Sequence, residues 1–107
     1  MKESNAAYTL ELSIEPHVNI RQIEVFRAVM LAGSVVGAAK LLSVTQPSVS
    51  RTLALLEHRL GYPLFERRGR RLVPGSEADA LFREVEHLYV GVDRFVQLAA
   101  DLRAQRA

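Results

Sequence analysis

The chain has 107 residues, of which 49% are hydrophobic, and this length and composition fit one folded domain with a single core. It contains no cysteine, which excludes disulfides, thiolate catalysis and cysteine-ligated zinc and is compatible with a reducing cytoplasm. No apolar run is long enough to span a bilayer, and the first residues lack the pattern of a secretion signal. We therefore expect a cytoplasmic protein with no membrane partner.

The positive charge is concentrated in one section of the chain. The net charge is +2, yet residues 19–74 sum to +6, whereas residues 1–18 and 75–107 each sum to −2. A basic section between two acidic ones suits a polyanionic partner such as a nucleic acid. A charged surface that is merely solvated is the alternative explanation.

Residues 1–18 form an N-terminal extension for which two structures are open. Tyr8, Leu10, Leu12 and Ile14 alternate with polar or charged residues, which is the pattern of a half-buried strand. A flexible tail is the prediction that we favour, because chain ends are usually poorly ordered.

Two helices are predicted at the start of the positive section. The first runs from about residue 20 to 32, with Asn19 as its N-cap and Gly33 just beyond its end. The second covers residues 35–42 and is capped by Ser34. Its inner face is expected to consist of Val36, Ala39 and Leu42.

A third helix follows a short turn, with Thr45 as its cap and Gly61 as its stop. Its apolar residues recur at helical spacing and must face the core; they are Val49, Leu53, Leu56 and Leu60. The side chains left pointing outward at its N-terminal end are Gln46, Ser48, Ser50 and Arg51. An exposed polar start on an otherwise buried helix suits insertion into a DNA groove.

A basic hairpin is predicted after the third helix. Residues 64–67 and 71–73 are two short candidate strands around Arg68-Gly69-Arg70, where glycine suits a turn. An ordinary basic loop is the alternative. Three helices followed by a hairpin make a mainly α winged helix-turn-helix over residues 19–75.

Residues 76–107 show one long helical pattern without proline, which Ser76 is placed to cap. Apolar residues recur four and three positions apart, as in a heptad stripe. The helix would be roughly 45 Å long at about 1.5 Å per residue, which exceeds the size of so small a domain. Dimerisation through this helix is therefore predicted, with packing against its own domain as the alternative. The stripe consists of Leu81, Val85, Leu88, Val92, Phe95, Ala99 and Leu102.

The side chains of the third helix and the hairpin have the chemistry of DNA contacts. The Gln46 amide can read an adenine edge, serine hydroxyls can contact bases or phosphates, and Arg51 can reach a guanine or a phosphate. Hairpin arginines suit the phosphate backbone or a narrow minor groove. Pairing of Arg67 or Arg59 with the Glu57 carboxylate is an open alternative. The candidate DNA-binding residues are Thr45, Gln46, Pro47, Ser48, Ser50, Arg51, Arg67, Arg68, Arg70 and Arg71.

An enzyme is not indicated. His17, His58 and His87 lie far apart in different elements and have no metal-ligand spacing around them. Ser48 and Ser50 have no histidine placed to activate them, and no phosphate-binding loop is present. We expect no catalytic residue, no metal and no cofactor.

The motif residues resemble the signature of LysR-type transcriptional regulators over roughly residues 19–105. The resemblance implies a DNA-binding domain followed by a linker helix and looks closest to the branch that regulates opine and amino-acid catabolism. The family's effector-binding domain has no counterpart here, so we expect the chain to be an excerpt of a regulator whose small-molecule effector binds elsewhere. A naturally truncated regulator is the alternative. The matching residues are Ala39, Leu42, Gln46, Ser50, Leu53, Leu56-Glu57, Leu60-Gly61, Leu64-Phe65 and Arg67.

The resemblance also implies partners and contacts. Linker helices in the family pair antiparallel between subunits, which implies a homodimer bound to an interrupted palindrome in double-stranded DNA, with a tetramer as an option for the full-length protein. A protein-interaction module with an incidental basic face and an RNA-binding winged helix are the competing functions. By resemblance, recognition-helix positions fall on Gln46, Pro47, Ser48, Ser50 and Arg51, and wing positions on Arg67, Arg68 and Arg70.

Overall fold

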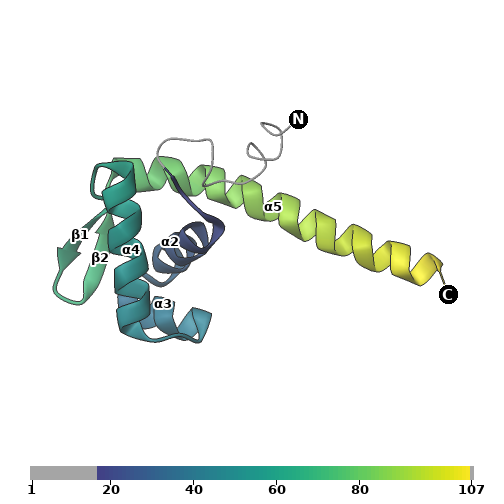
Figure 1. Cartoon of the computed structure of the whole chain (residues 1–107), viewed down its shortest axis with the longest axis horizontal. Helices are drawn as coiled ribbons and strands as arrows, with labels where there is room; N and C mark the ends of the chain where they lie inside the picture. Colours follow the sequence, from purple (N-terminus) through teal and green to yellow (C-terminus); the bar gives the residue numbers. More distant parts are fainter. Residues whose placement is uncertain (1–16, 107) are drawn as a thin grey trace.

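A computed structural model describes residues 17–106 (Figure 1). The predicted strand or tail within residues 1–16 lies outside the described residues. In the described part, the chain forms a mainly α winged helix-turn-helix with a long C-terminal helix, as predicted. The elements in chain order are α2 (Ile20–Ala32), α3 (Val35–Leu42), α4 (Gln46–Leu60), β1 (Phe65–Arg68), β2 (Arg71–Pro74) and α5 (Ser76–Gln105).

The predicted caps set the bounds of the first three helices. Asn19 and Gln22 form a capping box, in which each side chain accepts a hydrogen bond from the other residue's backbone N–H. The Ser34 and Thr45 hydroxyls accept hydrogen bonds from backbone N–H groups at the starts of α3 and α4. Gly33 ends α2 in the left-handed region, at φ +78°, which favours glycine.

The predicted cap of α5 is wrong. The N-cap is Gly75, and no side chain caps this end, because Ser76 is already the first helical residue. Its hydroxyl lies 3.5 Å from a Glu77 carboxylate oxygen and does not cap a backbone N–H. Two acidic residues in the first turn, Glu77 and Asp79, place negative charge at the positive end of the helix dipole.

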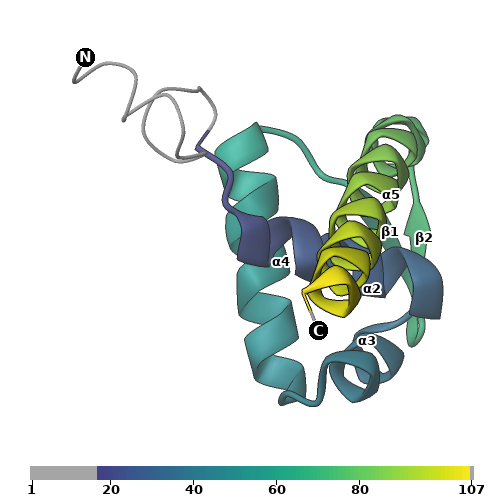
Figure 2. The same cartoon turned by 90° about the vertical axis from the view of Figure 1, so that its right-hand side faces the viewer.

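Two apolar clusters make up the core. One joins α2, α3 and α4 to Leu72 of β2, and the other lies beneath α5, where Phe26, Leu56 and Leu64 meet Ala78 and Val85. Figure 2 shows α5 crossing α2, with α4 standing beside them. The helices and the wing strands therefore form one packed body from which only the distal part of α5 emerges.

The inner face of α3 differs from the prediction at one residue. Ala39 is buried and Leu42 packs against the core, but Val36 is 37% exposed and Ala38 is fully buried in its place. The alanines let α3 approach its neighbours closely. The start of α3 lies close to the end of α2, because a Cβ added at the neighbouring Gly37 would lie 2.8 Å from the Ala32 Cβ.

The hairpin is present; β1 lies one residue later than predicted, and β2 begins at the predicted residue and ends one residue later. Its two strands pair antiparallel, and Arg68 pairs with Arg71 at the tip. The turn therefore contains two residues, the first of which is Gly69 at φ +62°. Two-residue hairpin turns often need a positive φ at this position, which explains the glycine. Leu64 lies before β1 and is buried in the core.

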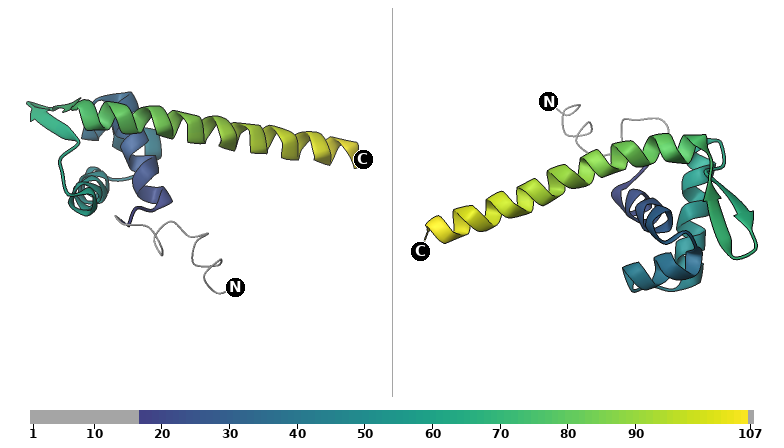
Figure 3. Two further views of the ribbon diagram at one scale, coloured as in Figure 1. Left: turned by 90° about the horizontal axis from the view of Figure 1, so that it is seen from above. Right: turned by 180° about the vertical axis from the view of Figure 1, so that it is seen from behind.

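Only the first half of α5 packs on the domain. Leu81 and Val85 contact the core beneath them, so packing against the chain's own domain is correct for the start of the heptad stripe. Tyr89 is the last residue of α5 that is not exposed, and residues 90–106 are all exposed. Figure 3 shows this distal half extending away from the rest of the molecule. No helix in the described part of the chain is long and apolar enough to cross a membrane.

Candidate nucleic-acid interface

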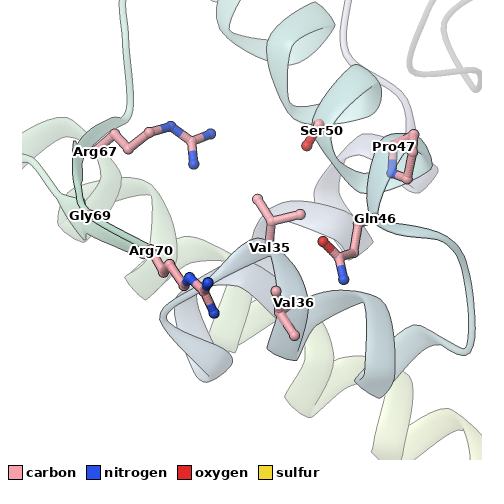
Figure 4. A pocket seen from close by; sticks show the side chains of 8 residues that line it. All are labelled: Val35, Val36, Gln46, Pro47, Ser50, Arg67, Gly69 and Arg70. Atoms are coloured by element: carbon pink, nitrogen blue, oxygen red, sulfur yellow. The ribbon is translucent and has the colours of Figure 1, made fainter.

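A cleft separates the start of α4 from the hairpin, which we call the wing (residues 65–74). It has a volume of about 610 Å³ and is open to solvent. Figure 4 shows the guanidinium groups of Arg67 and Arg70 reaching from the wing into the space before α3 and α4. The lining residues are Val35, Val36, Gln46, Pro47, Ser50, Arg67, Gly69 and Arg70.

The structure brings together half of the predicted DNA-binding residues in this cleft. Gln46, Pro47 and Ser50 are exposed on the first turns of α4, opposite Arg67 and Arg70 of the wing. The other five do not line it. Those five are Thr45, Ser48, Arg51, Arg68 and Arg71.

The wing and α4 present mostly unneutralised positive charge. Arg68 pairs with Glu66 at 3.0 Å, and both side chains are about two-thirds exposed. Within residues 17–106, the remaining arginines of the predicted set form no ion pair. Their charges are therefore free to act on an anionic partner. These arginines are Arg51, Arg67, Arg70 and Arg71.

The Glu57 carboxylate positions the wing and does not pair with an arginine. One of its oxygens accepts hydrogen bonds from the backbone N–H groups of Leu64, at 2.7 Å, and Phe65, at 3.3 Å. The alternative pairing with Arg67 or Arg59 is therefore wrong, and Arg59 instead donates to the backbone carbonyl of His17. Sequence reasoning missed this role of Glu57. The available signal was an acid near the negative C-terminal end of a helix, where a carboxylate needs a specific partner.

Two further backbone hydrogen bonds fix the wing, one to the α2–α3 turn and one across its own base. The backbone N–H of Leu72 donates to the Gly33 carbonyl, at 3.0 Å, and that of Gly75 donates to the Leu64 carbonyl, at 2.9 Å. Leu72 is also buried in the core. Because α4, the α2–α3 turn and the start of α5 all contact the wing, its backbone is held in place relative to α4.

The three histidines occupy separate elements. His58 lies on α4 and His87 on α5, and both are exposed, while His17 precedes α2. Between residues 17 and 106, no three or more histidine, cysteine or acidic side chains are grouped so that they could hold a metal ion.

Comparison with known proteins identifies the family. Residues 20–79 match the model of the bacterial regulatory helix-turn-helix proteins of the lysR family. The octopine catabolism/uptake operon regulatory protein OccR of Rhizobium meliloti is 46% identical over 90 residues, which are 84% of this chain and 30% of that protein. The transcriptional activator protein LysR of Escherichia coli K12 is 49% identical over 89 residues, or 83% of this chain and 29% of that protein.

Solved structures agree with these relatives. The DNA-binding domain of BenM, in complex with catB site 1 DNA, aligns with a TM-score of 0.73 and 28% identity, covering 84% of this chain and 97% of that one. The chain spans about 30% of the length of the curated relatives. The OccR match agrees with the resemblance to the opine branch that was drawn from the sequence. The chain belongs to the lysR family of bacterial regulatory helix-turn-helix proteins and has the fold of a DNA-binding domain; its relatives are named as regulators of transcription, not as enzymes.

Proposed function

We propose that this chain binds double-stranded DNA as a homodimer, each copy reading one half-site of an interrupted palindrome. The cleft between the polar start of α4 and the wing arginines carries the proposal. It combines hydrogen-bonding groups that can read base edges with charges that can bind phosphates. In this proposal residues 19–75 are the reading domain and residues 76–107 the dimerisation helix.

Recognition of the DNA base sequence is assigned to the start of α4. The Gln46 amide offers a donor and an acceptor, which match an adenine edge in the major groove, and Arg51 has the fork that suits guanine. Ser48 and Ser50 supply hydroxyls to bases or phosphates. Thr45 has its oxygen engaged as the helix cap, so its hydroxyl hydrogen is what remains for a phosphate. Pro47 shapes the first turn without a backbone donor.

Backbone binding is assigned to the wing. Arg67 and Arg70 extend into the cleft and would lie beside the duplex that α4 enters. Arg68 and Arg71 flank the turn and would contact phosphates or the minor groove on either side. The Glu66 partner of Arg68 partly offsets its charge, so we expect Arg68 to contribute least of the four.

Dimerisation is assigned to the distal half of α5. Four residues of the heptad stripe lie beyond the last packed turn and are exposed: Val92, Phe95 at 73%, Ala99 and Leu102. An exposed apolar stripe of this length marks a protein-interaction site, and a second copy of the same helix completes a heptad pair. Antiparallel pairing of the two distal halves would bring Val92 of one copy near Leu102 of the other.

Selection from a random duplex pool tests the proposal. We expect enrichment of sequences with two inverted half-sites, and binding that weakens steeply between low and physiological salt because arginine–phosphate contacts release counterions. Enrichment of structured RNA over duplex DNA would favour the RNA-binding alternative. If an Arg51→Ala, Arg70→Ala double variant lost DNA binding but kept its regulatory effect in cells, the protein-interaction alternative would be favoured.

A further inference from the structure

The long helix leaves the domain at a single point. Tyr89 is half-buried, and each described residue after it is exposed. The part from Val90 to Gln105 therefore extends about 24 Å beyond the domain, at a rise of about 1.5 Å per residue. Because this part makes no contact with the domain in the described chain, its direction is set by the packed stretch of α5 that ends at Tyr89. Figures 1 and 3 show the free part extending away from the domain.

One side chain of α2 holds α5 at this exit point. The Nε of Arg27 donates to a carboxylate oxygen of Glu86, at 3.1 Å, and the Arg27 guanidinium carbon lies 4.1 Å from the centre of the Tyr89 ring. Glu86 and Tyr89 are three residues apart, so they lie on the same face of α5. The guanidinium thus donates to one residue through its Nε–H and lies over the ring of the other. We call these three residues the exit clamp.

The exit clamp is directional where the neighbouring contacts are not. The apolar contacts of Leu81 and Val85 restrain α5 through close packing, but the attraction that buries them has no preferred direction. A hydrogen bond and a ring contact made by one guanidinium both weaken when α5 rotates or tilts. Glu86 and Tyr89, which make these two contacts, also lie closer to the free part of the helix than Leu81 and Val85 do.

We propose that Arg27 is a positioning residue that sets the direction in which α5 leaves the domain. In a dimer joined through the distal halves of α5, that direction fixes the distance between the two recognition helices. Arg27 would therefore determine which spacing between half-sites the protein accepts, although it lies outside the DNA-binding cleft. This last step rests on the proposed dimeric function, whereas the direction of α5 in one chain does not.

Arg21 provides a matched control on the same helix. Its guanidinium pairs with Glu24, one turn away on α2, and both side chains are nearly half exposed. Arg21→Met removes the same charge as Arg27→Met and also breaks an ion pair, but that pair does not reach α5. Any effect of Arg27→Met that Arg21→Met does not share therefore comes from the exit clamp.

Distances between two spin labels test the direction of α5. Because the chain contains no cysteine, Ala54→Cys on α4 and Arg103→Cys on α5 place two labels at exposed positions. An excess of unlabelled chain restricts the measurement to labels within one copy. We expect a narrow distance distribution in the parent and with Arg21→Met, and a broadened one with Arg27→Met or Tyr89→Leu. Tyr89→Phe, which keeps the ring, should stay narrow. An unchanged distribution with Arg27→Met, in a chain that circular dichroism shows to be folded, would overturn the proposal.

Binding to duplexes with graded spacing tests the consequence for DNA. The selected half-sites are placed at separations that differ by one base pair, and affinity is measured for each. We expect the parent to prefer one spacing and Arg27→Met to discriminate about fivefold less, the size given by a partly exposed cation–π contact. Affinity for a duplex with a single half-site should not change. If the parent shows no spacing preference, the proposed dimeric function fails while the label distances still decide the role of Arg27. Broadened distances with an unchanged spacing preference would overturn the link from Arg27 to spacing.

Discussion

The wing and the outer half of α5 are the two regions to which partner binding is assigned, but only the wing is anchored to the helical core by contacts within its own chain. Glu57 and the Gly33 carbonyl hold its two strands, and Leu72 anchors it in the core. The outer half of α5 has no such support, and its apolar stripe is exposed. Reading one half-site is therefore a property that a single chain can possess, whereas measuring the distance between two half-sites needs a second copy.

The largest effect is expected from a charge on the exposed stripe. Phe95→Asp should change the free energy of unfolding of the single chain little, because Phe95 is 73% exposed. In the proposed dimer it buries an unpaired carboxylate, which costs several kcal/mol, so the dimer dissociation constant should rise by about 100-fold or more. Sedimentation equilibrium measures it. Val90→Asp, at an exposed position outside the stripe, is the control, and an equal loss with both variants would contradict pairing through the stripe.

The next effect separates the two sides of the cleft. Gln46→Ala should lower discrimination at one base pair by about 1–3 kcal/mol, because it removes a base-edge contact. Arg70→Ala should weaken all duplexes similarly and reduce the slope of log affinity against log salt by about 1. Titrations of matched and mismatched duplexes at several salt concentrations measure both quantities. If the two variants lost specificity equally, the division between reading helix and phosphate-binding wing would be wrong.

A smaller effect tests how the wing is held. Glu57→Ala leaves the N–H groups of Leu64 and Phe65 without their acceptor, which should lower the free energy of unfolding by about 1 kcal/mol. Glu57→Gln keeps an acceptor oxygen and should lose less. Urea denaturation gives the stability, and hydrogen exchange should quicken at the two amides. Unchanged exchange with Glu57→Ala would show that other contacts suffice to fix the wing.

The contrast between local and distant contacts also explains what the sequence could predict. Asn19, Ser34, Thr45 and Gly33 predicted the helix bounds because capping depends on residues only a few positions apart. The stripe of α5 was predictable for the same reason. The partner of Glu57 and the rotation of α3 that exposes Val36 were not, since both depend on how separate elements pack.

The contacts of Arg27 could not be predicted from any local pattern in the sequence. It meets Glu86 across 59 positions of sequence, and nothing near Arg27 in the chain marks it as different from Arg21. The candidate cleft could be predicted in part. Its two sides were predicted from local patterns, but the structure was needed to show that Arg67 and Arg70 face it while Arg68 and Arg71 do not line it.

The smallest effect concerns Gly91, which lies just beyond the exit clamp. Within the described chain, nothing approaches within 4 Å of the Cβ that a substitution would add there. Gly91→Ala should therefore stabilise α5 by about 0.5–1 kcal/mol, through the higher helix propensity of alanine. Hydrogen exchange of the amides after residue 91 measures this in dilute, monomeric protein. Gly91 neighbours Leu88 and Phe95 at helical spacing, so a close approach by a partner helix would reverse the sign in the dimer. Stabilised monomer with a weakened dimer would place the crossing of the two helices at Gly91, and equal stabilisation of both would place it elsewhere along the stripe.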